Sequence, residues 1–262
     1  MAQQSKKSKQ SPEIQLSVVT ITYNERDNIQ LFIEEVSQVF REQGLLGEII
    51  VVDDSSPDGT SDVVLELKQK YSSNPSFPSL TLIKRPGKMG ISSAYRDGLA
   101  AARGKAITLL DADLSHHPRQ IPELYAVTKE HKIGWGSRYL GATKFETDFF
   151  HRIGTSLLNR WIAFWLKTGM NDHTLGYFVI RKDQLDQIIE LGKSKRLDPF
   201  DHTLYGITIA ALAKKAGFPI VEIKAPYNRR VHGETKINFF WGLRVVLGDM
   251  LYTLKLYSRL RP

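Results

Sequence analysis

The stretch Ile107-Thr108-Leu109-Leu110-Asp111-Ala112-Asp113-Leu114-Ser115-His116-His117-Pro118 decides which fold and which site we expect. Its first four residues form an apolar run without helical spacing, which is typical of a buried strand in a parallel sheet. Asp111 and Asp113 follow where that strand should end, and Pro118 interrupts any continuing strand or helix. Open α/β sheets bind ligands at the carboxyl ends of their strands, so a site is expected here. The alternative is a solvated acidic turn, which is common in proteins.

Strand-like and helix-like segments alternate along the chain before this stretch. This alternation predicts right-handed βαβ crossovers, and therefore an α/β fold with a mostly parallel, Rossmann-like sheet and flanking helices. The predicted strands are 16–22, 48–52, 80–84 and 107–110. A first helix is predicted from apolar residues at helical spacing between positions 29 and 40, and two further helices are predicted over 60–71 and 92–102.

Three of the predicted strands end in polar or acidic residues: Tyr23–Glu25, Asp53–Asp54 and Asp111–Asp113. In a doubly wound sheet these three ends share one edge, so we expect them to lie close together. Asp-x-Asp presents oxygen ligands on one side of an extended segment, which suits a hard divalent cation that carries substrate phosphates.

The first predicted turn lacks the glycines of the common nucleotide-binding loops. Residues 22–26 read Thr-Tyr-Asn-Glu-Arg where a dinucleotide-binding enzyme would show Gly-x-Gly-x-x-Gly, and no P-loop is present. A carboxylate after the second strand can still accept a hydrogen bond from a ribose hydroxyl or a base N–H, and Tyr23 can stack on a base. Together with a cation at Asp111 and Asp113, these features describe a nucleotide-diphosphate binder without a glycine loop.

Composition and charge set broader limits. The 262 residues suffice for one large α/β domain with an appended C-terminal element. The net charge of +8 comes partly from residues 1–12, which we expect to form a disordered basic tail, and the chain has no cysteine. The tail lacks the apolar core of a signal peptide, and no apolar stretch reaches the roughly 18–20 residues of a spanning helix. Basic charge also suits a nucleic-acid-binding protein, although no such binding motif is recognisable.

The motifs Thr22–Glu25, Val52–Thr60 and Asp111–Pro118 resemble successive motifs of the dolichyl-phosphate mannosyltransferase family. The resemblance extends from about residue 16 to residue 236. Members of this family are inverting enzymes of glycosyltransferase family 2 with the GT-A fold. The resemblance therefore implies a GT-A domain over residues 13–236, followed by an amphipathic helix over residues 237–262.

The resemblance also implies roles for individual residues. The metal is expected to be Mg²⁺ or Mn²⁺, held by Asp111, Asp113 and Ser115, and the catalytic residues are expected to be Asp113 and Arg138. The acceptor phosphate is matched to Arg138, Arg152 and Ser156. The nucleotide-sugar donor is matched to Tyr23, Glu25, Val52, Asp54, Asp111, Ala112, Asp113, Ser115, Arg138, Arg230 and Lys236.

The implied reaction is transfer of mannose from GDP-mannose to dolichyl or another polyprenyl phosphate, on the cytoplasmic side of a membrane, which is the endoplasmic reticulum in a eukaryote. The acceptor is already anionic, so no strong general base is needed. Residues 157–166 and 239–257 combine aromatic and aliphatic side chains with cations, which suits helices lying in the headgroup region. The alternative is that both helices pack on the core or on each other. A small membrane-anchoring subunit is a further expected partner, and nucleic acid is not.

Four residues depart from the family pattern. Ile21 replaces a proline, Phe178 replaces an arginine, and Gly206 and Thr208 replace a Gln-x-Glu pair. The last three departures lie in the half of the chain that shapes the sugar and acceptor sites. They leave open a second transferase that uses another donor, such as UDP-glucose.

Overall fold

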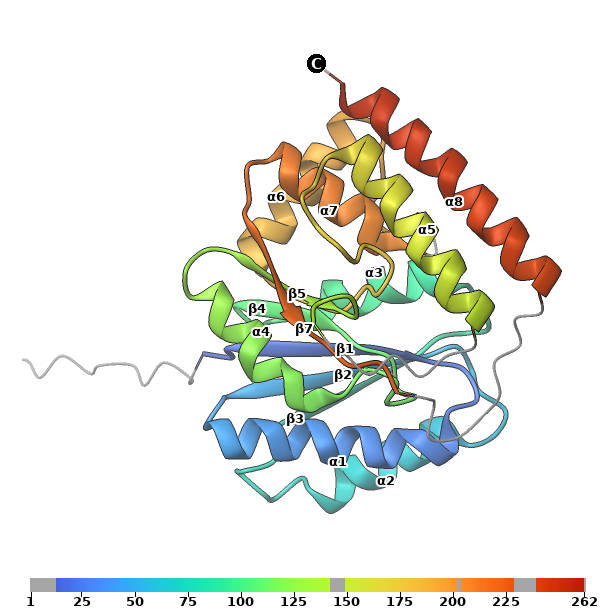
Figure 1. Cartoon of the computed structure of the whole chain (residues 1–262). Coiled ribbons are helices and arrows are strands. Elements are labelled where there is room, and N and C mark those ends of the chain that lie inside the picture. Colours follow the sequence, from blue (N-terminus) through green and yellow to red (C-terminus); the bar gives the residue numbers. More distant parts are fainter. Residues whose placement is uncertain (1–12, 142–148, 202–203, 229–238, 262) are drawn as a thin grey trace, which may run out of the picture.

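A seven-stranded mixed β-sheet organises the chain (Figure 1). The computed structural model describes residues 13–141, 149–201, 204–228 and 239–261, and its strand order is β3-β2-β1-β4-β6-β5-β7. Neighbouring strands pair in parallel except β6, which is antiparallel to β4 and β5. The strands are β1 (Leu16–Thr22), β2 (Gly47–Asp53), β3 (Ser79–Lys84), β4 (Ala106–Leu109), β5 (Ile133–Ser137), β6 (Phe178–Arg181) and β7 (Ile220–Lys224).

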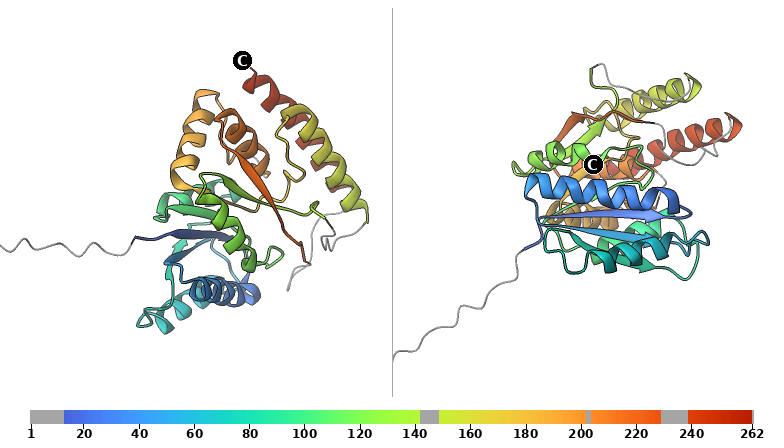
Figure 2. Two further views of the ribbon diagram at one scale, coloured as in Figure 1. Left: turned by 60° about the vertical axis from the view of Figure 1, so that its left-hand side comes forward. Right: turned by 90° about the horizontal axis from the view of Figure 1, so that it is seen from below.

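Helices cover both faces of this sheet, as the views in Figure 2 show. The reason is visible in β1 and β2, which are mostly apolar and almost entirely buried, so that successive side chains enter different cores. Val18 and Ile49 pack with α1, α2 and α4, whereas Val19 and Ile50 face the core that includes α3, α6 and α7. The helices are α1 (Arg26–Gln43), α2 (Thr60–Lys70), α3 (Ile91–Ala101), α4 (Ile121–Thr128), α5 (Phe149–Leu166), α6 (Lys182–Ser194), α7 (Tyr205–Lys215) and α8 (Phe239–Leu260), with a short 3-10 turn η1 (Pro118–Gln120) before α4.

The sequence predictions for the first half of the chain are confirmed. Each of the four predicted strands is present with ends that differ by at most one residue, and the apolar positions predicted for the first helix are buried in α1. The α/β class and the mostly parallel sheet are also confirmed. The antiparallel strand β6 was not predicted. It arises because the segment after α5 returns to the edge where β5 ends, so β6 starts at that edge and runs back between β4 and β5.

Helices α5 and α8 lie side by side as a parallel pair (Figure 1). A side chain at Gly154 would meet Val246, the indole N–H of Trp161 donates to the carbonyl of Met250, and Trp165 packs edge-on against Tyr257. Contacts therefore advance in the same direction along both helices. Neither these helices nor any other in the described part of the chain is long and apolar enough to cross a membrane.

Candidate active site

One edge of the sheet collects the polar segments that follow separate strands. The carboxyl ends of β1, β2 and β4 are neighbours because these strands are parallel, as the sequence predicted. Strand β6 is antiparallel to both β4 and β5, and β7 is parallel to β5, so β5 and β7 run in the same direction as β4. The carboxyl ends of β5 and β7 therefore lie at this edge as well. A backbone bridge between His116 and Tyr227 joins the loop after β4 to the segment after β7.

Asp54 organises a loop beside the predicted nucleotide pocket. Its neighbour Asp53 is fully buried and folds the turn after β2, whereas Asp54 forms an ion pair of 2.5 Å with the buried Arg85. The second oxygen of Asp54 accepts from the backbone N–H groups of Met89 and Gly90 at 3.2 and 3.3 Å. The carboxylate predicted to contact the donor therefore also fixes the loop between β3 and α3.

Tyr23 and Glu25 lie at the start of the first polar turn. Tyr23 is 39% exposed, and the ammonium of Lys88 lies 4.0 Å from its ring centroid. The backbone N–H of Glu25 donates to Thr60 at 3.0 Å, and its carboxylate accepts from Asn28 at 2.7 Å. An aromatic face and a cation thus stand together where the base of a nucleotide was predicted.

Val52 and Ala112, also matched to the donor, have side chains that belong to the two cores. Val52 is 0% exposed and Ala112 is 3% exposed. Any contact that these two residues make with a donor must therefore use backbone N–H or C=O groups.

Asp111, Asp113 and Ser115 form the predicted metal site directly after β4. Asp113 is 4% exposed, and its Oδ1 accepts from the backbone N–H of Ser115 at 2.9 Å. The hydroxyl of Tyr95 donates to Oδ1 of Asp111 at 3.1 Å. Each carboxylate therefore has an oriented oxygen, and carboxylate and hydroxyl oxygens are what Mg²⁺ and Mn²⁺ prefer.

These residues fit a divalent cation that is shared with a substrate. No group of three or more His, Cys, Asp or Glu side chains able to hold a metal occurs among the described residues. A cation at Asp111 and Asp113 would consequently take its remaining ligands from water or from donor phosphates, which is usual for Mg²⁺.

His116 lies beside this site in an aromatic enclosure. Its ring centroid is 5.5 Å from that of Tyr177 and 5.4 Å from that of Tyr227. Burial lowers the pKa of His116, although the charges of Asp111 and Asp113 act in the opposite direction. Its Nε2 is buried and has no hydrogen-bond partner within the described ranges, so this atom is a candidate for a ligand contact.

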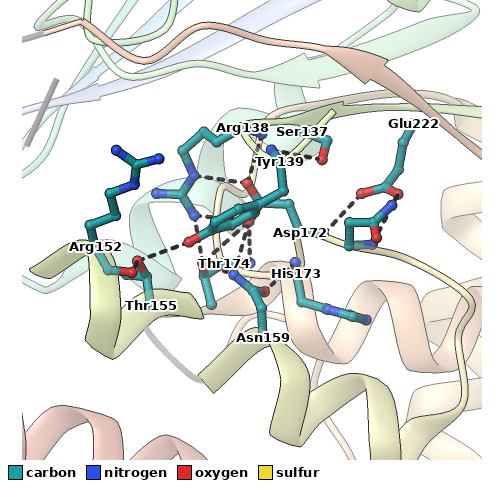
Figure 3. A network of polar contacts seen from close by, with 11 residues as sticks. Ser137, Arg138, Tyr139, Arg152, Thr155, Asn159, Asp172, His173, Thr174 and Glu222 are labelled. Atoms are coloured by element: carbon teal, nitrogen blue, oxygen red, sulfur yellow. Dashed lines mark hydrogen bonds and ion pairs between the residues drawn. The ribbon is translucent and has the colours of Figure 1, made fainter. Parts of the chain in front are cut away.

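Arg138, at the end of β5, is held by Asp172 (Figure 3). Its Nε and Nη2 donate to the two carboxylate oxygens of Asp172 at 2.8 Å each, and Nη2 also donates to Thr174 at 2.6 Å. Burial disfavours both charges, yet the hydrogen bonds and the mutual attraction dominate: the pKa of Arg138 is raised and that of Asp172 is lowered. The guanidinium is therefore charged and fixed in orientation.

The same network reaches α5. The Tyr139 hydroxyl donates to Thr155 at 3.0 Å. Asn159 accepts from the backbone N–H of His173 at 2.7 Å and donates to Thr174 at 3.1 Å. Figure 3 shows these side chains converging from α5, the turn after β5 and the loop before β6.

The two remaining acceptor residues flank this network. A surface pocket is lined by Tyr139, Arg152, Ile153 and Ser156, which brings Arg152 and Ser156 together. Arg230 and Lys236 lie outside the described residues. The predicted basic tail, residues 1–12, and the predicted boundary between residues 236 and 237 also lie outside them.

Sequence reasoning missed several residues at this edge. Arg85 follows β3, whose carboxyl end is next to that of β2, so the rule that identified the other turns could have found it. Asp172 precedes an antiparallel strand, and the alternation of strands and helices gave no signal for it. Tyr95 and Tyr227 are recognisable only from the contacts of the folded chain.

Comparison with known proteins defines the class. The profile of glycosyl transferase family 2 matches residues 17–189, and the chain belongs to this family. A mannosyltransferase from Pyrobaculum calidifontis, solved with GDP-Man and Mn²⁺, has the same fold with a TM-score of 0.54 and 14% identity, covering 95% of this chain and 74% of that chain. The GT-A architecture is thereby confirmed.

Two curated relatives are more similar in sequence. The dolichol-phosphate mannosyltransferase of Pyrococcus furiosus is 32% identical over 229 residues, covering 86% of this chain and 59% of the relative. This chain thus spans less than two thirds of the length of that relative. The polyprenol monophosphomannose synthase of Mycolicibacterium smegmatis is 30% identical over 228 residues, covering 84% of this chain and 80% of the relative.

Proposed function

We propose that this chain is a metal-dependent, inverting glycosyltransferase that moves mannose from GDP-mannose to dolichyl or another polyprenyl phosphate at a membrane surface. One observation carries the proposal: the carboxylate pair after β4, the fixed Arg138 after β5 and the basic start of α5 meet at one edge of the sheet. The names of the two curated relatives support the same donor sugar and the same class of lipid acceptor.

Each part of this edge has a role in the proposed reaction. A cation held by Asp111, Asp113 and Ser115 would offset the negative charge that develops on the leaving nucleoside diphosphate. The acceptor is a phosphate monoester whose second pKa is about 6, so it is nucleophilic at neutral pH without a general base. Because Asp172 offsets much of its charge, Arg138 serves chiefly as an oriented donor, and the exposed Arg152 supplies net positive charge.

The outer face of the α5–α8 pair suits a lipid surface. On α5 the exposed residues Ile153, Leu157 and Phe164 fall within about 40° of each other at 100° per residue, opposite Asn159, which faces the site.

Among the described side chains of α8, from residue 244 onward, the large apolar residues that are exposed are Leu247 and Leu251, on the side opposite the buried Asp249 and Leu256. Since the helices are parallel and in contact, both apolar stripes face the same way, outward from the sheet.

Cations accompany these stripes. Arg160 and Arg244 are exposed beside them, and the single acidic residue in 152–167 and 244–261 is the buried Asp249. Apolar anchors with surrounding cations and no exposed acid are typical of surfaces that bind anionic membranes. We therefore propose peripheral binding through this face, on the cytoplasmic side of a membrane, with a small anchoring subunit as the other occupant to be tested.

The departures from the family pattern leave a second donor, such as UDP-glucose, as the alternative. Phe178 is buried and stacks on Trp135 with ring centroids 5.0 Å apart, where the family has an arginine. A side chain at Gly206 would come within 2.9 Å of the carbonyl oxygen of His173 and 3.2 Å of Trp135. These residues support the loop that carries Asp172, so a change in sugar preference is the effect to look for.

Nucleotide-dependent stabilisation separates the candidates. The protein is melted with GDP, UDP or duplex DNA, each with and without Mn²⁺. Stabilisation by GDP that requires Mn²⁺ is expected, and the same result with UDP would favour the second donor. Stabilisation by DNA alone would favour a nucleic-acid-binding protein instead.

A further inference from the structure

Tyr95 connects helix α3 to the carboxylate pair. Its side chain is 1% exposed, and its hydroxyl donates to Oδ1 of Asp111 at 3.1 Å. Asp111 itself is only partly buried and stands at the sheet edge. A tyrosine in the core of the domain therefore forms a hydrogen bond with a side chain of the proposed metal site.

The position of this hydroxyl is fixed by packing. Gly98, one turn after Tyr95, brings α3 close to the sheet, because a side chain there would come within 2.4 Å of Val19. The ring of Tyr95 meets that of Tyr205 edge-on with centroids 5.0 Å apart, and the Tyr205 hydroxyl donates to the carbonyl of Gly176 at 3.0 Å. Neither ring can turn without disturbing this arrangement, so the hydroxyl is a rigid donor.

We propose that Tyr95 is a positioning residue that orients Asp111 for the metal. A hydrogen bond to one carboxylate oxygen restricts rotation of the side chain and so directs the other oxygen. The ordinary alternative is a core tyrosine that has merely found an acceptor for its hydroxyl. The proposal rests on the proposed function, because it assumes that Asp111 binds a divalent cation.

The two interpretations differ in what the hydroxyl does to metal affinity. Loss of a hydrogen bond to a metal-binding side chain typically weakens metal affinity by about 10- to 100-fold. Tyr95→Phe keeps the ring and its packing, so we expect Mn²⁺ binding in the presence of GDP to weaken by about 10-fold. A purely structural tyrosine would lower the melting temperature without changing the Mn²⁺ affinity of the folded protein.

The control is Tyr252→Phe, which removes a hydroxyl that hydrogen-bonds to Thr208 and leaves Tyr95, Tyr205 and Asp111 unchanged. Free Mn²⁺ is measured by electron paramagnetic resonance during titration of wild type and both variants, each with saturating GDP. Weakening confined to Tyr95→Phe, with full occupancy restored by excess Mn²⁺, supports the proposal. A misfolded fraction would not be restored by added metal.

Three results overturn the inference in distinguishable ways. If wild type binds Mn²⁺ with GDP and Tyr95→Phe binds it equally well, Tyr95 does not position Asp111 and the proposed function stands. If Tyr95→Phe stays deficient at excess Mn²⁺, the effect is structural and the positioning role is wrong. If wild type binds no Mn²⁺ with GDP, the proposed metal site fails together with the inference.

Discussion

At the scale of single residues, the pair of Arg138 and Asp172 illustrates how burial changes the meaning of a charge. An exposed arginine would be free to bind any phosphate, but Arg138 is 7% exposed and both hydrogen bonds from its guanidinium to Asp172 are 2.8 Å long. A buried pair of this kind is costly to break, because the remaining partner is left as an uncompensated charge. The pair therefore serves the site by fixing the orientation of the Arg138 guanidinium more than by attracting a phosphate.

Asp172→Asn should therefore destabilise the protein by about 3 kcal/mol, since a buried Arg138 would lose its carboxylate. The change is measured by urea unfolding at pH 7. Asp183→Asn is the matched control, because it breaks the more exposed pair with Arg181 and should cost under about 1 kcal/mol. Equal and small effects of the two substitutions would show that the Arg138 pair is dispensable.

The stabilising effect of Asp172 also has a pH dependence of known sign. Although burial raises the pKa of an aspartate, Arg138 lowers that of Asp172 below its ordinary 3.8 overall. The contribution is thus present above the unfolded value and is lost as the pH falls through the lower folded value. Acid denaturation of Asp172→Asn should accordingly depend less on pH in this window than that of wild type.

At the scale of secondary structure elements, one side of α5 contacts the candidate site and the opposite side is exposed and apolar. Thr155 and Asn159 hold the loops that carry Arg138 and Asp172, while Leu157 and Phe164 are exposed on the other side. A helix that only packed on the core would carry polar residues on its outer side. We therefore expect the exposed apolar stripes on α5 and α8 to bind a second surface, such as a membrane.

The double substitution Leu157→Ser and Leu251→Ser should reduce binding to vesicles that contain anionic lipid by about 10-fold or more, because each leucine buries several methylene groups in the membrane. Cosedimentation measures this, and GDP binding should stay unchanged. Leu65→Ser on α2, where the leucine is 50% exposed, is the matched control. Undiminished vesicle binding by the double variant would leave a protein partner as the occupant of this face.

Asp249 marks the inner side of α8. It is 2% exposed, and burial raises its pKa from 3.8 to about 7. The folded state therefore binds more protons than the unfolded state between about pH 4 and pH 7, and stability falls as the pH rises through this window. Above pH 7 the charged carboxylate remains a destabilising feature of the interface.

Asp249→Asn should raise the melting temperature at pH 8 by about 3–6 °C and leave it nearly unchanged at pH 4, because the amide has the shape of the neutral acid. Differential scanning calorimetry at the two pH values gives the comparison. Asp186→Asn on α6, an exposed aspartate, serves as control. A larger gain at pH 4 than at pH 8 would contradict the assigned direction.

At the scale of the whole molecule, local patterns predicted the first half of the chain better than the second. Strands β1, β2 and β4 are buried, mostly apolar runs that are followed by polar turns, so their ends and their common edge could be predicted from the sequence. By contrast, β5 contains Gly134 and Gly136 and lacks a clear strand pattern. Its glycines are explained by tertiary packing, because a side chain at Gly134 would come within 2.3 Å of the Leu124 carbonyl oxygen.

The candidate site shows the same limit. Asp111 and Asp113 follow from a strand end and a familiar motif, whereas the partners of Arg138 and Asp54 depend on which distant segments meet at the edge. Sequence reasoning identified the charges but not their pairing. The pairing decides how much of each charge is available to a ligand.

Sugar transfer to a polyprenyl phosphate tests the central claim most directly. Purified protein is incubated with radiolabelled GDP-mannose or UDP-glucose, Mn²⁺ and vesicles containing a short polyprenyl phosphate, and label is counted in the lipid fraction. We predict transfer from GDP-mannose that is abolished by chelation and reduced at least about 100-fold in Asp113→Ala. Protein that is stabilised by GDP yet transfers no sugar from either donor to the lipid would contradict the proposed function.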